Sequence, residues 1–278
     1  YFQAKKEHID TVMFYADKAL LLDPELDQSL VAKALSYMIT GENQKALPYF
    51  EKALEYNPNS VPAILYLTDY YGRYQPNTSK YLENALTLLQ LTIHSQDSNL
   101  TSHSYFNAGT AFLYTGFLKK AEVYINRALA YSPGDMYTEF LKAYILLLKN
   151  GKLNQTKDLF IKLYKKDTTH LFMMHETGKI CFYLREYEES YKYYKKFMQA
   201  KDVYQLNILE AEYVKIGAVC SELGLTEESE ELFIAFLDYS KKDKTIYKNF
   251  HLASYYSYIG DIKKALKYLK LFSQEDYY

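Results

Sequence analysis

The chain contains no tryptophan and few turn-forming residues, with 10 glycines and 6 prolines among its 278 residues. Because Gly and Pro mark the connections between elements, their scarcity favours long helices over many short strands. Long apolar runs are missing as well, since no stretch approaches the ~18 residues of a membrane-spanning helix. We therefore expect a helical protein with no membrane span.

Neither sign of charge is in excess: Lys and Arg number 33, Asp and Glu number 34, and the net charge is −1. Nucleic-acid binding depends largely on phosphate neutralisation and should leave a basic surplus. We therefore expect no nucleic-acid binding by this segment. Cysteine is also scarce, with Cys181 and Cys220 alone, and two reduced, buried thiols would fit a cytoplasmic location.

What the chain does contain is tyrosine, 32 residues in all, and a repeated stretch. "GENQKALPYFEKALEYNP" runs from Gly41 to Pro58, and "GFLKKAEVYINRALAYSP" runs from Gly116 to Pro133. Both read Gly, four residues, Ala, six residues, Ala-Leu, three residues and Pro. In each copy a helical pattern precedes the Gly and another follows it, so the repeat predicts a helical hairpin. One hairpin cannot bury its own apolar face, but stacked copies can, which predicts a solenoid.

This frame resembles the tetratricopeptide (TPR) repeat family. The resemblance implies an all-α fold, a right-handed superhelical solenoid of antiparallel helix pairs, as a single domain over 4–278. An orphan helix is expected at 5–22. The expected units lie near 27–60, 61–101, 102–135, 136–170, 171–204, 205–243 and 246–278.

Three segments depart from a regular array. Residues 1–3 resemble the remnant of an expression tag and are set apart from the fold. "LREYEES", after Cys181, lacks the glycine that the other turns carry. The segment Lys201–Glu210 is expected to lengthen the first helix of the unit near 205–243.

The resemblance implies that the first helix of each unit lines a concave groove that holds a peptide. Carried over by position, the hypothetical groove residues are His103, Phe106, Asn107, Tyr114, Phe140, Tyr144, His175, Lys179, Phe182 and Tyr183. Large aromatic side chains with a polar tip are favoured at interaction hot spots, and Asn107 would hydrogen-bond a ligand backbone. The alternative is that many of these aromatic residues fill gaps between units.

One activity of the family is argued against. TPR co-chaperones grip the carboxylate of heat-shock proteins with Lys at the fifth position of the first helix. The fifth positions here are Val31, Leu65, Phe106, Phe140, His175, Val214 and Phe250, so the carboxylate clamp is absent. No phosphate-binding glycine loop or nucleophile elbow is present, and "HETGK" at His175 lacks the second His of a zinc-protease helix. We expect no enzyme, no catalytic residue, no metal and no cofactor.

The leading interpretation is a non-catalytic scaffold that binds a protein or peptide segment in its aromatic groove. The outermost helices lack the polar outer faces of terminal repeats. From them we expect a segment of a larger protein, of which it is the interaction or regulatory part. Homo-oligomerisation through the open end helices is a further expectation. The alternatives are a self-assembly or sensory module of a bacterial signalling or transcriptional regulator, and a groove for a small ligand.

Overall fold

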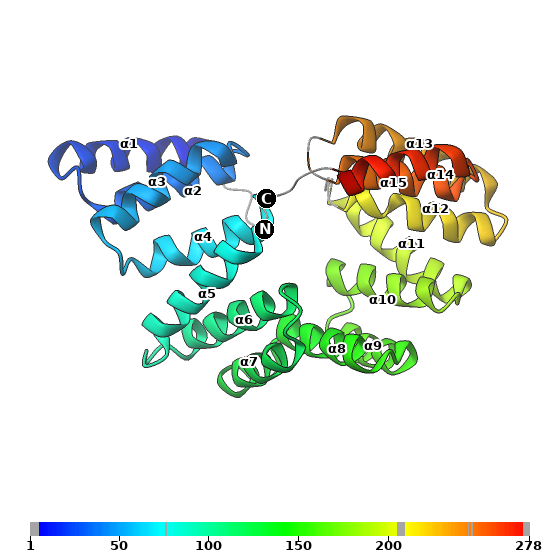
Figure 1. Cartoon of the computed structure of the whole chain (residues 1–278), viewed down its shortest axis with the longest axis horizontal. Helices are drawn as coiled ribbons and strands as arrows, with labels where there is room; N and C mark the ends of the chain where they lie inside the picture. Colours follow the sequence, from blue (N-terminus) through cyan, green and yellow to red (C-terminus); the bar gives the residue numbers. More distant parts are fainter. Residues whose placement is uncertain (1–5, 76, 205–208, 244, 246, 275–278) are drawn as a thin grey trace. The chain divides into compact units, whose positions relative to one another are not determined.

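The computed structural model describes residues 6–75, 77–204, 209–243, 245 and 247–274 (Figure 1). Over these residues the chain forms 15 α-helices and one short 3₁₀-helix, with no strand. The expected all-α solenoid fold class is confirmed. The expected tag remnant, residues 1–3, lies outside the described residues.

The chain divides between Lys149 and Asn150 into two compact units, and each is described by itself. The expectation of one continuous solenoid over 4–278 stays a prediction. The helices that begin in the first unit are α1 (Lys6–Leu22), α2 (Asp27–Ile39), α3 (Asn43–Tyr56), α4 (Val61–Arg73), α5 (Thr78–Thr92), α6 (Ser98–Tyr114), α7 (Leu118–Tyr131) and α8 (Met136–Asn150).

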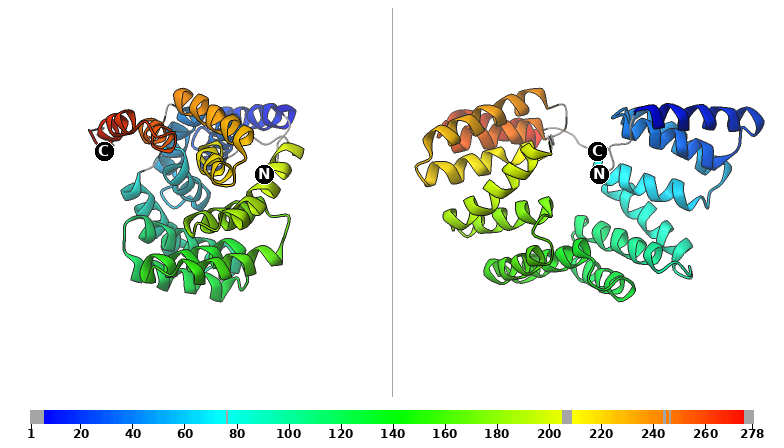
Figure 2. Two further views of the ribbon diagram at one scale, coloured as in Figure 1. Left: turned by 90° about the vertical axis from the view of Figure 1, so that its right-hand side faces the viewer. Right: turned by 180° about the vertical axis from the view of Figure 1, so that it is seen from behind.

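The second unit repeats the same hairpin plan in three pairs, α10 with α11, α12 with α13, and α14 with α15. Its elements are α9 (Leu153–Lys166), α10 (Leu171–Tyr183), α11 (Tyr187–Val203), η1 (Glu210–Glu212), α12 (Tyr213–Glu222), α13 (Thr226–Lys242), α14 (Lys248–Tyr258) and α15 (Ile262–Gln274). Figure 2 shows these helix pairs from two further sides. By their place in the repeat, we call α2, α4, α6, α8, α10, α12 and α14 first helices, and α3, α5, α7, α9, α11, α13 and α15 second helices.

The turn inside a hairpin requires left-handed backbone. At the end of α2, Gly41 has φ +80°, its N–H donates to Met38 O, and the N–H of Glu42 donates to Tyr37 O over 2.8 Å. This pair of bonds satisfies two carbonyls that a helix end leaves open. After α10 the same turn forms without glycine: Arg185 has φ +59°, and the N–H of Glu186 donates to Cys181 O over 3.0 Å.

The two helices of a hairpin approach closely at one position. A Cβ added to Gly178 would lie 2.9 Å from the ring of Tyr194, so α10 and α11 touch there without room for a methyl group. The contact is also hydrogen-bonded, because Ser190 Oγ donates to Gly178 O over 2.8 Å. The next hairpin repeats the bond, with Ser229 Oγ donating to Gly217 O over 2.9 Å.

The cores of the two units are filled differently. In the first unit the second helices bury alanines, such as Ala46, Ala53 and Ala128. In the second unit the position of Ala53 and Ala128 is taken by Phe197 and Phe236, both fully buried. Burial of a phenylalanine side chain contributes about 1.5–3 kcal/mol. At this repeat position the second helices of the second unit therefore bury a larger side chain than those of the first unit.

The prediction that Lys201–Glu210 lengthens the following first helix is wrong. Lys201 belongs to α11, where it is buried and its amino group contacts the hydroxyl of Tyr213 at the start of α12. Leu209 has φ +57°, which ends any helical continuation before η1. The left-handed residue breaks the chain direction, so α12 begins only at Tyr213.

None of the helices in the described part of the chain combines the length and the hydropathy needed to cross a bilayer.

Candidate functional site on the first helices

The predicted groove residues fall in both units. His103, Phe106, Asn107, Tyr114, Phe140 and Tyr144 belong to the first unit, and His175, Lys179, Phe182 and Tyr183 belong to the second. They therefore form two candidate surfaces, each presented by first helices.

On α6 the aromatic side chains lie along the helix and overlap in pairs. The exposed ring of His103 stacks on half-buried Phe106, with centroids 6.3 Å apart. At the end of the helix Tyr114 is 59% exposed, and its ring lies 5.8 Å from the ring of Tyr81. The helix thus presents a π-face at its start and another at its end.

On α8 the two predicted residues lie one turn apart and stack. The rings of Phe140 and Tyr144 are 5.9 Å apart with an interplanar angle of 29°. Both side chains are half-buried, so each combines a packed edge with an accessible one. Stacked, partly fixed rings lose little conformational freedom when a ligand covers them.

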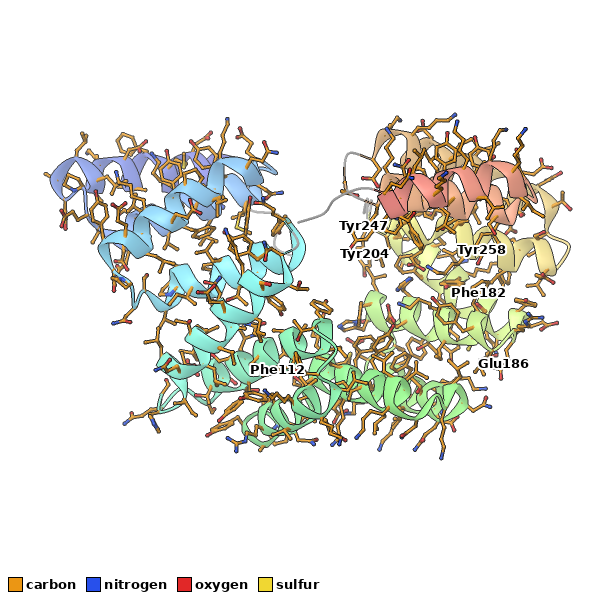
Figure 3. The ribbon with its side chains drawn as sticks, viewed as in Figure 1. Phe112, Phe182, Glu186, Tyr204, Tyr247 and Tyr258 are labelled. Carbon is orange, nitrogen blue, oxygen red and sulfur yellow. The ribbon has the colours of Figure 1, made fainter. Side chains whose placement is uncertain are left out.

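In the second unit the aromatic residues come from different first helices. Phe182, near the end of α10, lies 6.5 Å from Tyr258 at the end of α14 (Figure 3). Phe182 also contacts Tyr183, at 5.6 Å, and Tyr187. Tyr183 is 50% exposed and Tyr258 is 43% exposed. We call Phe182, Tyr183 and Tyr258 the aromatic cluster of the second unit.

Two of the predicted residues lie beneath these surfaces. Asn107 and His175 are each 2% exposed. Asn107 Nδ2 has no hydrogen-bond partner among the described residues. A ligand contact by either side chain stays a prediction, and it would require the surface above it to open.

His175 sits in a buried charged cluster. Its Nδ1 lies 3.2 Å from Glu176 Oε1, and its Nε2 lies 3.3 Å from Glu212 Oε2. Each carboxylate also pairs with a lysine of its own helical turn, Glu176 with Lys179 at 2.6 Å and Glu212 with Lys215 at 2.8 Å. The cluster joins α10 to η1 and the start of α12.

The charges of this cluster stabilise one another. Burial alone would lower the pKa of His175, but the Glu176 and Glu212 carboxylates outweigh it and raise that pKa. Burial would raise the pKa of Glu212, yet His175 and Lys215 hold it at about 2. His175 and Lys179 likewise lower the pKa of Glu176 against the effect of burial. Since both carboxylates are paired, the cluster serves as a cross-link between elements rather than as a free general base.

Sequence reasoning missed most of this cluster. It singled out His175 and Lys179 by repeat position, but it did not identify Glu176, Glu212 or Lys215. A Glu next to a small-residue position in the middle of an otherwise apolar helix was the available signal for Glu176, because a carboxylate buried there needs a cationic partner. Glu212 had no such signal, since it follows the segment Lys201–Glu210, whose course was predicted incorrectly.

Comparison with known proteins gives one repeat match and a fold. A family model described as tetratricopeptide repeat matches residues 28–60. No curated protein matches the chain. PilF of Pseudomonas aeruginosa is 16% identical with a TM-score of 0.56, and the match covers 84% of this chain and 97% of PilF.

Two larger proteins share the fold over nearly the whole chain. Yeast Tom70 is 16% identical with a TM-score of 0.60, over 96% of this chain and 55% of Tom70. Cut9, from the APC/C hetero-tetramer Cut9–Hcn1, is 13% identical with a TM-score of 0.63, over 95% of this chain and 46% of that one. At these identities the likeness concerns the fold alone. With the repeat match over residues 28–60, the hairpin turns and the close helix contacts, it shows that the chain carries a tetratricopeptide repeat within a fold of stacked helix pairs.

Proposed function

We propose that the protein is a non-catalytic scaffold that binds a peptide segment of a partner protein on the aromatic surfaces of its first helices. The observation that carries the proposal is the exposure of large aromatic side chains there. Tyr114, Tyr183 and Tyr258 are 59%, 50% and 43% exposed, although each packs one edge against another ring. Such residues combine apolar area with a polar tip, which is the composition of interface hot spots.

A helical array suits this task because the surface is formed before the ligand arrives. Its side chains are held by neighbouring rings, as Phe140 is by Tyr144, so little order remains to be gained on binding. A disordered peptide would then bear most of the ordering cost, which keeps the interaction reversible.

The test selects peptides from a random 12-residue library on the wild-type protein and measures their affinity for first-helix variants. Phe106→Ala with Tyr144→Ala tests the first unit, and Tyr183→Ala with Tyr258→Ala tests the second. Removal of hot-spot residues typically costs about 2 kcal/mol or more each, so at least one double variant should lose on the order of 30-fold or more in affinity. The matched control is Tyr131→Ala, because Tyr131 is 43% exposed but lies on the second helix α7.

Folding of each variant is checked by circular dichroism and by thermal unfolding. If the library yields no specific peptide, or if folded double variants bind as tightly as the Tyr131→Ala control, the first-helix surfaces do not bind peptides and the proposal fails.

Self-assembly is the second candidate, and α15 is the feature that favours it. Ile262, Leu266 and Leu269 are 69%, 61% and 47% exposed, and they lie on one side of this helix. Contact with a second copy would cover them. A mass that rises with concentration in light scattering, and that Leu266→Glu returns to the monomer, supports this candidate. A strict monomer at high concentration excludes it.

We also propose a cytoplasmic location and a regulatory role within a larger protein. Both cysteines are free and buried, as a reducing compartment permits. Recovery of the native protein from an extracytoplasmic fraction would contradict the location.

A further inference from the structure

A hollow of about 590 Å³ lies on the second unit, beside the second helix α11. Its walls come from the end of α9, the start of α10 and the last two turns of α11. The lining includes Tyr164, Met174, Lys196, Ala200, Val203 and Tyr204. None of these residues belongs to the aromatic cluster of the second unit, so the hollow is separate from the candidate peptide surface described above.

A second hollow, of about 490 Å³, continues the first along α11. Lys196 and Gln199 line both, so the two are contiguous. The residues from Glu188 to Val203 that line them follow one side of α11 over four helical turns. At 1.5 Å per residue this side is roughly 22 Å long. We call the combined feature the α11 trench.

The deep end of the trench is apolar. Its floor is formed by Tyr164 and Met174, which are 7% and 6% exposed. At its mouth Val203 and Tyr204 are 76% and 65% exposed. An aliphatic side chain that is three-quarters exposed at the edge of an apolar floor gains burial when a partner's apolar group enters.

The middle of the trench carries three lysines, Lys192, Lys195 and Lys196, and two carboxylates, Glu188 and Glu189. Lys196 Nζ donates to the hydroxyl of Tyr164 over 3.2 Å, and Lys195 Nζ lies 5.4 Å from the centroid of the Tyr191 ring. Among the described residues neither of these lysines pairs with a carboxylate, whereas their neighbour Lys192 pairs with Glu189 at 3.0 Å. Two ammonium groups near apolar surface are thus left for an anion from outside the chain.

We propose that the α11 trench is a docking site for an acidic segment of a partner protein that also carries a large apolar side chain. The apolar side chain would enter between Tyr164, Met174 and Val203, and carboxylates would meet Lys195 and Lys196. Charge complementarity selects this occupant, because three lysines line the trench against two carboxylates and one of those carboxylates, Glu189, is already paired with Lys192. The length of the trench matches about 6–7 extended residues. The site goes beyond the proposed first-helix function and does not depend on it.

The test uses fluorescence anisotropy with a labelled peptide of about 12 residues in which glutamates flank a Phe and a Leu. Two matched peptides are compared with it, one with Gln in place of Glu and one with Ser in place of Phe and Leu. The full chain should bind the first peptide and bind each of the others at least about 10-fold more weakly. Affinity should fall as salt increases, since the contacts with the lysines are exposed to solvent.

Lys195→Glu combined with Lys196→Glu should weaken binding of the acidic peptide at least about 10-fold, and Val203→Ser should weaken it several-fold. The matched control is Lys263→Glu with Lys267→Glu, because these lysines are exposed on α15 of the same unit, and it should change affinity less than about 2-fold. Lys196 donates to the hydroxyl of the buried Tyr164, so thermal unfolding of each variant is measured, and Lys195→Glu alone, which breaks no such bond, should still weaken binding in a protein that unfolds at the wild-type temperature.

Three results would overturn the proposal. The first is no binding of the acidic peptide at low salt. The second is a loss of binding in Tyr183→Ala with Tyr258→Ala but not in the α11 variants, which would move the peptide to the first-helix surface. The third is equal binding of the peptide without apolar residues and of a single-stranded oligonucleotide, which would show only attraction of any polyanion. If only the first-helix proposal fails, the results expected for the α11 trench stay the same, so the two failures can be told apart.

Discussion

His175 Nε2 lies 3.3 Å from Glu212 Oε2, and this contact links the first helix α10 to the 3₁₀-turn that precedes the next first helix, α12. The other ring nitrogen faces Glu176 at 3.2 Å. The imidazole is 2% exposed, and the two carboxylates raise its pKa and so favour its charged form, which would link successive hairpins.

This contact predicts how stability changes with pH. Because the pKa of His175 is raised in the folded protein, its stabilisation is complete below the unfolded value of about 6.5 and is lost as pH rises through the folded pKa. His175→Gln should remove this dependence and cost about 3 kcal/mol at pH 6, because it leaves two buried carboxylates without their shared cation. Urea unfolding between pH 5.5 and 9, followed by circular dichroism, measures both effects.

His94→Gln is the matched control, because His94 is exposed on the first unit, and it should retain the wild-type pH profile. Glu176 and Glu212 make stability depend on pH in the acid range. Because folding lowers the pKa of both carboxylates, their stabilisation is lost as pH falls below about 4.5, and for Glu212 this loss continues down to about pH 2. An unchanged profile between pH 6 and 9 in His175→Gln would show that the imidazole is not charged in the fold.

Arg185 is a position at which glycine should stabilise the protein. Its φ of +59° costs a residue with a Cβ about 1–2 kcal/mol, and glycine avoids this at the expense of extra freedom in the unfolded chain. Arg185→Gly should therefore raise the free energy of unfolding by about 0.5–1 kcal/mol, and Arg185→Ala should give no gain. Thermal unfolding of the three proteins decides the matter, and a lower Tm for the glycine variant would rule out strain at this turn.

The glycines at the helix contacts predict a graded response to one added methyl group. A Cβ would lie 2.9 Å from the Tyr194 ring at Gly178 but 3.3 Å from the Phe233 ring at Gly217. Overpacking typically costs about 1–3 kcal/mol, while Ala in place of Gly returns up to about 1 kcal/mol of helix propensity. Gly178→Ala should be destabilising by about 1–2 kcal/mol and Gly217→Ala close to neutral. Equal urea midpoints for the two variants would contradict the close approach at Gly178.

The fold class was accessible from sequence because it depends on local, repeated features. Gly41 and Gly116 recur at one spacing, and the turn chemistry of each is visible in its own hairpin. Arg185 shows where this reasoning stops, since a turn held by its neighbours tolerates a residue that local preference would reject. The prediction for Lys201–Glu210 was wrong for a similar reason. Lys201 contacts Tyr213 in the interior, and a contact between two separate segments cannot be inferred from the sequence of either segment alone.

The candidate sites were harder to predict than the fold. Repeat position located exposed Tyr114 and Tyr183 correctly on first helices, but it could not tell that His175 is buried. Burial depends on which neighbours arrive from other helices, here Glu212 and Tyr194. Nothing in the sequence indicated the α11 trench, because "YKYYKKF" has the pattern of an ordinary solvated helix. The hollow is formed by residues of α9, α10 and α11 together, so it depends on how these three helices pack.

The reactivity of the two buried thiols should report local opening of the second unit. Burial raises the pKa of Cys181 to about 12 and that of Cys220 to about 11, so at pH 7 only on the order of one molecule in 10⁴ to 10⁵ carries a thiolate at either position. Alkylating reagents and oxidants, which attack the thiolate, can therefore reach these sulfurs only when a hairpin opens. Cys181 is buried on α10 and Cys220 is buried on α12, so the order in which the two thiols react should give the order in which adjacent repeats open.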